Sequence, residues 1–206
     1  MVASWVRRNF DGVGVTQYKP GRHLRSIQDH LCGAALLCID VSGSMRGAPL
    51  QAAVEGGLDF LAEAEQAGYR CGLVLWHHGV DDYLPTSTPP STVRARLKAA
   101  RSSGGNDLVP TLDVVIKELG PMRGDRVVCV FGDGDVGPEP PVKREAARAR
   151  QKGIRFVVRG LGAHASACLS RTLVPDEKDE AAHTVDDVGG LRRGIASMAA
   201  TLRRSP

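Results

Sequence analysis

Residues 33–45 read GAALLCIDVSGSM, and this stretch decides the fold that the sequence predicts. Its first seven residues form one apolar run, which is too short for a helix and ends at Asp40. A continuous apolar run of this length, bounded by Gly and Ser, is typical of a strand covered on both faces. The polar residues that follow therefore stand where a buried strand leaves the core.

The alternation of apolar strands and amphipathic helices continues along the chain. Further strands are predicted at residues 71–76, 82–85, 125–131, 154–161 and 183–185. Helices are predicted after Pro49, from Ser91 (as N-cap) to Arg101, around 112–119, and at 138–152, 166–173 and 188–202. Too few residues separate 71–76 from 82–85 for a crossover helix, so these two strands should pair antiparallel. The prediction is a three-layer α/β/α fold, doubly wound and Rossmann-like, with a mainly parallel six-stranded sheet and one antiparallel edge strand.

Length and composition indicate one domain with an arm. The chain has 206 residues, 42% hydrophobic and 24% charged, which suits one domain at residues 32–206 after an N-terminal arm at 1–31. No run approaches the roughly 18 apolar residues of a membrane span, and no apolar signal region follows the N-terminus, which predicts a cytoplasmic protein. The net charge of +4 is too small and scattered to indicate a nucleic-acid partner. The arm contains Trp5 and Phe10, which either pack on the domain or dock a partner.

The five cysteines are an odd number and show no CxxC spacing. Three of them lie within or beside apolar runs, which favours buried free thiols over a disulfide framework or a zinc ribbon. Arg far outnumbers Lys, and Ala and Gly are abundant, which suggests a GC-rich genome such as that of a bacterium.

Oxygen donors follow two of the predicted strands. Asp40, Ser42 and Ser44 alternate after the first strand, and Asp133 follows the strand at 125–131 between two glycines. In an open parallel sheet, ligands bind beyond the carboxyl ends of the strands. Carboxylate and hydroxyl oxygens without a thiolate suit Mg²⁺ or Mn²⁺ better than Zn²⁺.

Three segments carry a family resemblance: DVSGS at 40–44, GGNDL at 104–108 and DG at 133–134. In this order, and at the ends of these elements, they resemble the metal-ion-dependent adhesion site of the von Willebrand factor A domain, and the resemblance covers about residues 32–205. It implies that Asp40, Ser42, Ser44 and Asp133 hold a divalent metal. Asn106 stands where the family has a threonine.

The Asn106 position is a departure from the family pattern. An amide oxygen still donates to Mg²⁺, but the side chain is longer and planar, so direct, water-bridged and weakened binding all stay open. Thr111 follows five residues later, about one and a half helical turns on, and should not reach the metal.

The resemblance implies a non-catalytic adaptor in which an Asp or Glu of a partner protein completes the metal's shell. The sequence is similar to stand-alone bacterial members of the family, some of which accompany stress-response and signalling systems. One alternative is a Mg²⁺-dependent phosphoesterase with Asp135, His77 or His78 as bases. The phosphate loop GxxxxGK[ST] and the GxSxG elbow are both missing from the sequence. The other alternative is an inert scaffold in which Ser42 and Ser44 only cap a helix or turn.

Overall fold

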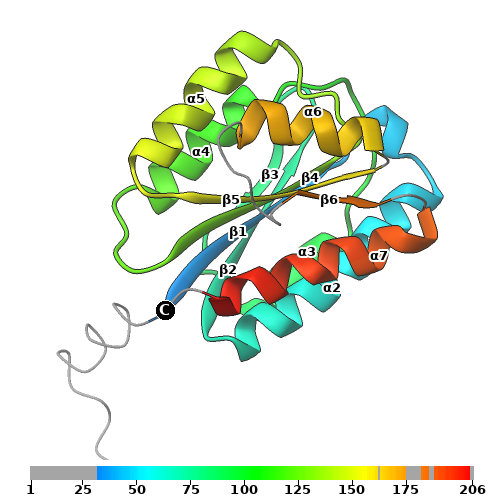
Figure 1. The fold of residues 1–206 in the computed structure, drawn as a ribbon. Coiled ribbons are helices and arrows are strands. Elements are labelled where there is room, and N and C mark those ends of the chain that lie inside the picture. The colour runs from blue at the N-terminus through cyan, green and yellow to red at the C-terminus, as the bar shows by residue number, and fades with distance from the viewer. Residues whose placement is uncertain (1–31, 162, 175–181, 186–187, 205–206) are drawn as a thin grey trace, which may run out of the picture.

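In the part of the chain that the structure describes, six strands form one sheet in the order β3-β2-β1-β4-β5-β6 (Figure 1). The computed structural model describes residues 32–161, 163–174, 182–185 and 188–204. The strands are β1 Gly33–Asp40, β2 Tyr69–Trp76, β3 Val80–Leu84, β4 Arg126–Gly132, β5 Arg155–Leu161 and β6 Ala182–Val185. The edge strand β3 pairs antiparallel with β2, and every other pair is parallel. The predicted fold class is confirmed.

Helices cover both faces of the sheet. They are α2 Ala48–Gln66, α3 Pro90–Lys98, α4 Val109–Leu119, α5 Glu139–Gln151, α6 Ala163–Leu173 and α7 Val188–Ser197, with 3₁₀ turns η1 Gly43–Met45 and η2 Met198–Arg204. In Figure 1, α2, α3 and α7 lie on one side of the sheet and α4, α5 and α6 on the other.

The central position of β1 in the sheet explains why its sequence is apolar throughout. Successive side chains of a strand point to opposite faces. Leu37 and Ile39 therefore join the core beneath α2 and α3, whereas Leu36 and Cys38 join the core beneath α4 and α5. All eight residues of β1 are buried. A strand in this position needs apolar residues at every place, not at alternate places.

Two helix boundaries differ from the sequence prediction. The N-cap of α3 is Pro89, with Pro90 in the first turn, and Ser91 makes no cap. Proline suits that place because its fixed φ is already helical and its missing N–H would have had no intrahelical partner. The helix also ends at Lys98, before Arg101. The predicted arm at 1–31 lies outside the described residues.

Two glycines allow α6 to lie close to the ends of β4 and β5. A Cβ atom on Gly160 would stand 2.2 Å from the backbone nitrogen of Ser166, and one on Gly134 would stand 2.6 Å from the Cα of Ala165. Gly134 also has a φ of 101°, which favours glycine. The first turns of α6 are therefore packed directly against the backbone beside Asp133.

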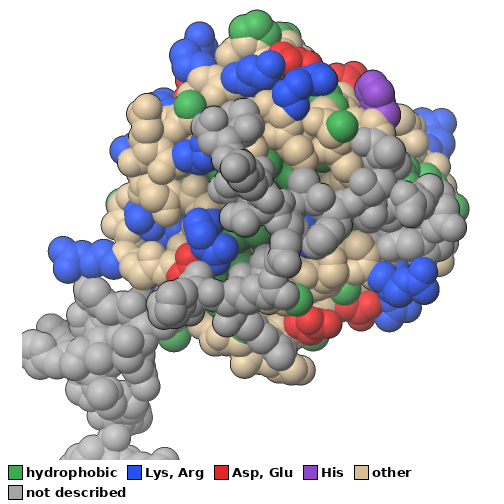
Figure 2. Space-filling view, viewed as in Figure 1, with side chains coloured by type: hydrophobic (Ala, Val, Ile, Leu, Met, Phe, Trp, Pro, Cys, Tyr) green, Lys and Arg blue, Asp and Glu red, His purple; other side chains and the backbone are tan. Residues whose placement is uncertain are grey.

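The remaining predictions concern the cysteines, membrane-spanning helices and surface charge. All five cysteines are free, as predicted, and Cys38, Cys71 and Cys129 are buried. None of the described helices combines the length and apolar character of a membrane-spanning segment. On the face shown in Figure 2, Lys and Arg side chains are spread over several parts of the surface, with Asp and Glu among them.

Candidate metal-binding site

The two predicted aspartates come from neighbouring strands. β1 and β4 pair in parallel, with Ile39 opposite Phe131, so the chain leaves the sheet at the same edge after both strands. Asp40, at the end of β1, is fully buried, and Asp133 follows β4 and is half-buried. The backbone N–H of Asp133 points to Oδ2 of Asp40 at 3.4 Å.

The carboxyl group of Asp40 organises the loop after β1. The backbone N–H of Ser42 donates to its Oδ1 at 2.7 Å. Burial raises the pKa of Asp40 to about 7, and the negative charge of Asp133 adds to this rise, whereas hydrogen bonds from Ser42 and from the Asp133 N–H oppose it. Two carboxyl groups thus face one another with only hydrogen bonds to compensate their charge.

Ser42 and Ser44 complete a cluster of oxygen atoms. Their hydroxyl oxygens lie 2.9 Å apart, and the Ser44 hydroxyl donates to Oδ2 of Asp133. Ser42 is buried and Ser44 is exposed, so the cluster runs from the core to the surface. Ser42 makes no side-chain cap to η1. Four of the five predicted ligands, Asp40, Ser42, Ser44 and Asp133, therefore converge with their oxygens facing one another.

Asn106 also reaches the cluster, but it presents its amide nitrogen. Its Nδ2 donates to the backbone oxygen of Asp135 at 2.8 Å and lies 3.4 Å from Oδ1 of Asp133. An N–H group cannot bind a cation, so the amide would have to rotate to offer its oxygen. Thr111, by contrast, is buried in α4, and its Oγ1 has no hydrogen-bond partner within the described residues.

The loop that carries Asn106 is fixed to the loop after β1 by backbone hydrogen bonds. The N–H of Ser103 donates to the oxygen of Val41 at 2.8 Å, and the N–H of Gly43 donates to the oxygen of Gly104 at 3.1 Å. These bonds hold the first two segments of the predicted site together. Gly104 and Gly105 are exposed at its rim.

Sequence reasoning missed the supporting role of the turn between β2 and β3. The backbone oxygen of His77 accepts the N–H of Asp107 at 2.8 Å. The rings of His77 and His78 stack at 4.3 Å between centroids, and a Cβ on Gly104 would stand 2.5 Å from Nδ1 of His78. Both rings therefore lie against the Gly104 segment. A glycine there, with φ of 74°, is the signal that could have indicated this close approach.

Trp76 is the second residue that sequence reasoning missed. It is fully buried at the end of β2, and a Cβ on Gly132 would lie 3.2 Å from its Cζ2 and 3.3 Å from Oδ2 of Asp40. Gly132 thus leaves room for both the indole and the carboxyl group. Nothing in the sequence pattern separates this tryptophan from an ordinary core residue.

The donor set fits a small divalent cation. Two carboxylates and two hydroxyls are hard oxygen donors, and Mg²⁺ and Mn²⁺ prefer such ligands. The described residues contain no cluster of three or more His, Cys, Asp or Glu side chains able to hold a metal, so hydroxyls are an essential part of this set. Asp40, Ser42, Ser44 and Asp133 fit the ion, and Asn106 fits it only after its amide rotates.

One known protein family resembles the part of the chain that carries the site. Residues 35–135 match the family model of the von Willebrand factor type A domain, and this stretch includes all five predicted ligands. This part of the chain is therefore similar to a von Willebrand factor type A domain. No curated protein matches the sequence closely enough to count as a relative.

Solved structures of similar fold come from several organisms. BatB from Bacteroides thetaiotaomicron shares 16% identity at a TM-score of 0.66, over 84% of this chain and 99% of that one. The von Willebrand factor domain of the pilus tip protein Mfa5 from Porphyromonas gingivalis shares 14% identity at a TM-score of 0.68, over 84% of this chain and 95% of that one. Manganese-loaded TRAP protein from Plasmodium vivax shares 13% identity at a TM-score of 0.68, over 85% of this chain and 74% of that one. At these identities the likeness establishes the fold.

Proposed function

We propose that the protein is a non-catalytic binding module that attaches a partner protein through a divalent metal. The observation that carries this proposal is the convergence of Asp40, Ser42, Ser44 and Asp133 at a partly exposed point of the sheet edge. Two similar domains, in the pilus tip protein Mfa5 and in manganese-loaded TRAP, support it by analogy.

Each residue of the cluster has a distinct part in this proposal. Asp40 is buried and fixed by the Ser42 N–H, so it would hold the ion from the core side. Ser44 and Asp133 lie nearer the surface, so they would hold it from the solvent side. When bound, the metal would supply positive charge at an open coordination position, which suits an Asp or Glu carboxylate of a partner. Gly104 and Gly105 are exposed and add no side chain of their own to this approach.

The enzyme alternative is less well supported because its three candidate bases already have structural partners. Nε2 of His77 lies 3.3 Å from Asp81, and His77 and His78 stack on each other. The Asp135 carboxylate accepts the N–H of Gly137 at 2.9 Å. Metal-dependent hydrolysis of p-nitrophenyl phosphate that disappears in Asp133→Ala would contradict the non-catalytic proposal.

The proposal is tested by capture of a partner on the immobilised full chain. We expect a protein from the native lysate to be retained when Mg²⁺ is in large excess over its Kd, and lost with EDTA or in Asp40→Ala. The control is Asp81→Ala, which removes an exposed carboxylate from the start of β3. A partner retained equally in EDTA and in Asp40→Ala would instead indicate the inert scaffold.

The Asn106→Thr variant should bind Mg²⁺ about tenfold more tightly, which corresponds to about 1.4 kcal/mol. A threonine hydroxyl can offer oxygen without first giving up the hydrogen bond that Nδ2 of Asn106 makes to Asp135. Isothermal titration calorimetry measures the change. Unchanged or weaker binding would show that position 106 does not correspond to the family's threonine.

A further inference from the structure

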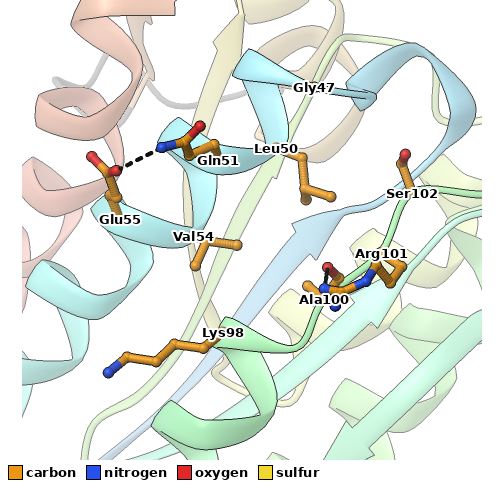
Figure 3. Close-up of a pocket in the computed structure, with 9 residues that line it drawn as sticks. All are labelled: Gly47, Leu50, Gln51, Val54, Glu55, Lys98, Ala100, Arg101 and Ser102. Atoms are coloured by element: carbon orange, nitrogen blue, oxygen red, sulfur yellow. Dashed lines mark hydrogen bonds between the residues drawn. The ribbon is translucent and has the colours of Figure 1, made fainter.

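A groove of about 450 Å³ opens between α2 and the end of α3 (Figure 3). We call it the α2–α3 groove. Its lining residues are Gly47, Leu50, Gln51, Val54, Glu55, Lys98, Ala100, Arg101 and Ser102. Figure 3 shows Glu55 and Lys98 at one end and Gly47 and Ser102 at the other.

The floor of the groove is apolar. Leu50 and Val54 of α2 are partly buried and pack on the hydrophobic core, and Ala100 is buried on the opposite side. In Figure 3, Leu50 and Val54 extend from α2 toward the segment that carries Ala100. When another apolar side chain covers this aliphatic floor and removes it from water, the free energy of the system falls.

The rim of the groove carries positive charge. Lys98 is exposed and makes no ion pair with any described residue, and Arg46, next to Gly47, is in the same state. Nη1 of Arg101 donates only to backbone oxygens, those of Ala99 at 3.1 Å and Ala100 at 2.9 Å. No acid stands in the first turn of α2, so the positive end of its dipole adds to this field.

The single acid of the rim is already compensated. Oε1 of Glu55 accepts the side chain of Gln51 at 3.4 Å, and Oε2 lies 3.5 Å from Nη1 of Arg192 on α7. The net electrostatic character of the α2–α3 groove is therefore set by Lys98, Arg101 and Arg46. Such a rim attracts a ligand of negative charge.

The groove adjoins the candidate metal site. Gly47 ends the loop that contains Ser42 and Ser44, and Ser102 precedes Ser103, whose N–H is bonded to Val41 of the same loop. Glu55 lies eight residues after Gly47, which is about 12 Å of helix. About four residues of an extended peptide cover that length.

We propose that the α2–α3 groove docks an acidic, aliphatic peptide segment of the partner protein. An aliphatic side chain packs on Leu50 and Val54, and carboxylates face Lys98 and Arg101. This inference rests on the proposed function in one respect: the same segment continues past Gly47 and gives a further carboxylate to the metal.

The charge of the predicted arm argues against the arm as the occupant of the groove. Residues 1–31 contain five Lys and Arg residues and two Asp, so the predicted arm has the same sign as the rim. Like charges disfavour that contact. We therefore place the acidic occupant in a partner protein and not in the arm.

The test uses the ¹⁵N-labelled full chain and a labelled hexapeptide of sequence Glu-Asp-Leu-Leu-Asp-Glu. With Mg²⁺ present, we expect amide shifts at Val54 and Ser102 and at least about tenfold weaker binding in Lys98→Glu and Arg101→Glu, as for loss of a charge contact worth about 1.4 kcal/mol. The peptide with Ser in place of Leu should also bind more weakly. The matched control is Lys117→Glu, which reverses an exposed charge on α4, on the opposite face of the sheet.

Repeating the titration with EDTA separates the two proposals. If the groove binds the peptide but no metal site exists, the shifts at Val54 and Ser102 and their dependence on Lys98 persist, and Mg²⁺ adds nothing. If binding depends on Mg²⁺ but is unaffected by Lys98→Glu and by the Ser peptide, the groove proposal is wrong and the metal proposal stands. Sedimentation that shows a wild-type dimer and a Lys98→Glu monomer would make a second copy the occupant and would also overturn the proposal.

Discussion

The Asp133→Ala substitution should weaken Mg²⁺ or Mn²⁺ binding by about 100-fold or more, since loss of even an outer-shell partner of a metal ligand costs about 10- to 100-fold. Asp133 is the point at which the three segments of the site meet. Its carboxylate accepts the Ser44 hydroxyl and faces Nδ2 of Asn106, and its N–H points to Asp40. Alanine removes the charge and both carboxylate contacts, and it keeps the backbone N–H that points to Asp40.

The fold should survive this change. Asp133 is half-buried, and its negative charge adds to the rise of the Asp40 pKa, so the two carboxyl groups destabilise one another when no cation is bound. We therefore expect Asp133→Ala to unfold at nearly the wild-type temperature in EDTA. Saturating Mg²⁺ should raise the unfolding temperature of the wild type only, since a ligand at about 100 times its Kd adds about 2.7 kcal/mol.

Asp135→Asn is the matched control for this measurement. Its carboxylate is two residues from Asp133, is exposed, and accepts a backbone N–H from Gly137, but it is not among the predicted ligands. Calorimetry should give wild-type metal affinity for Asp135→Asn. Equal loss in both variants would mean that any nearby negative charge suffices, and the proposed ligand set would be wrong.

The sequence predicted the backbone of the site because that backbone follows from the strand pattern. Asp40 and Asp133 each stand directly after an apolar run, and pairing of β1 with β4 brings both to one edge. The orientation of the Asn106 amide could not be predicted, because it depends on a hydrogen bond to Asp135 across the site. The support from His77 depends on a contact between residues thirty positions apart, His77 and Asp107.

The α2–α3 groove could not be predicted from the sequence for a different reason. Leu50 and Val54 recur at the spacing of an amphipathic helix, and that spacing predicts a face toward the core. It does not show where the core ends along the helix. Both residues lie at the margin of the apolar face, partly buried, where the segment after α3 leaves them uncovered. Three-dimensional packing alone distinguishes a core position from a docking position here.

The Gly160→Ala substitution should destabilise the domain by about 3 kcal/mol, at the upper end of the range for overpacking. The added Cβ would stand 2.2 Å from the backbone nitrogen of Ser166 and 2.5 Å from the carbonyl carbon of Ala165. These are backbone atoms of α6, so no side-chain rotation relieves the contact. For a chain of this size, the unfolding temperature should fall by roughly 6–12 °C.

The direction of this effect distinguishes packing from propensity. Alanine is otherwise favoured over glycine inside a strand, because glycine loses more backbone entropy on folding. A loss of stability must therefore come from displacement of α6. The control is Gly79→Ala, since a Cβ there meets nothing within 4 Å, and its stability should be unchanged or slightly higher. Gly134 contacts the same turn of α6 beside Asp133, so displacement of α6 should also weaken Mg²⁺ binding. Unchanged metal affinity in a destabilised Gly160→Ala protein would show that the position of α6 does not affect the metal site.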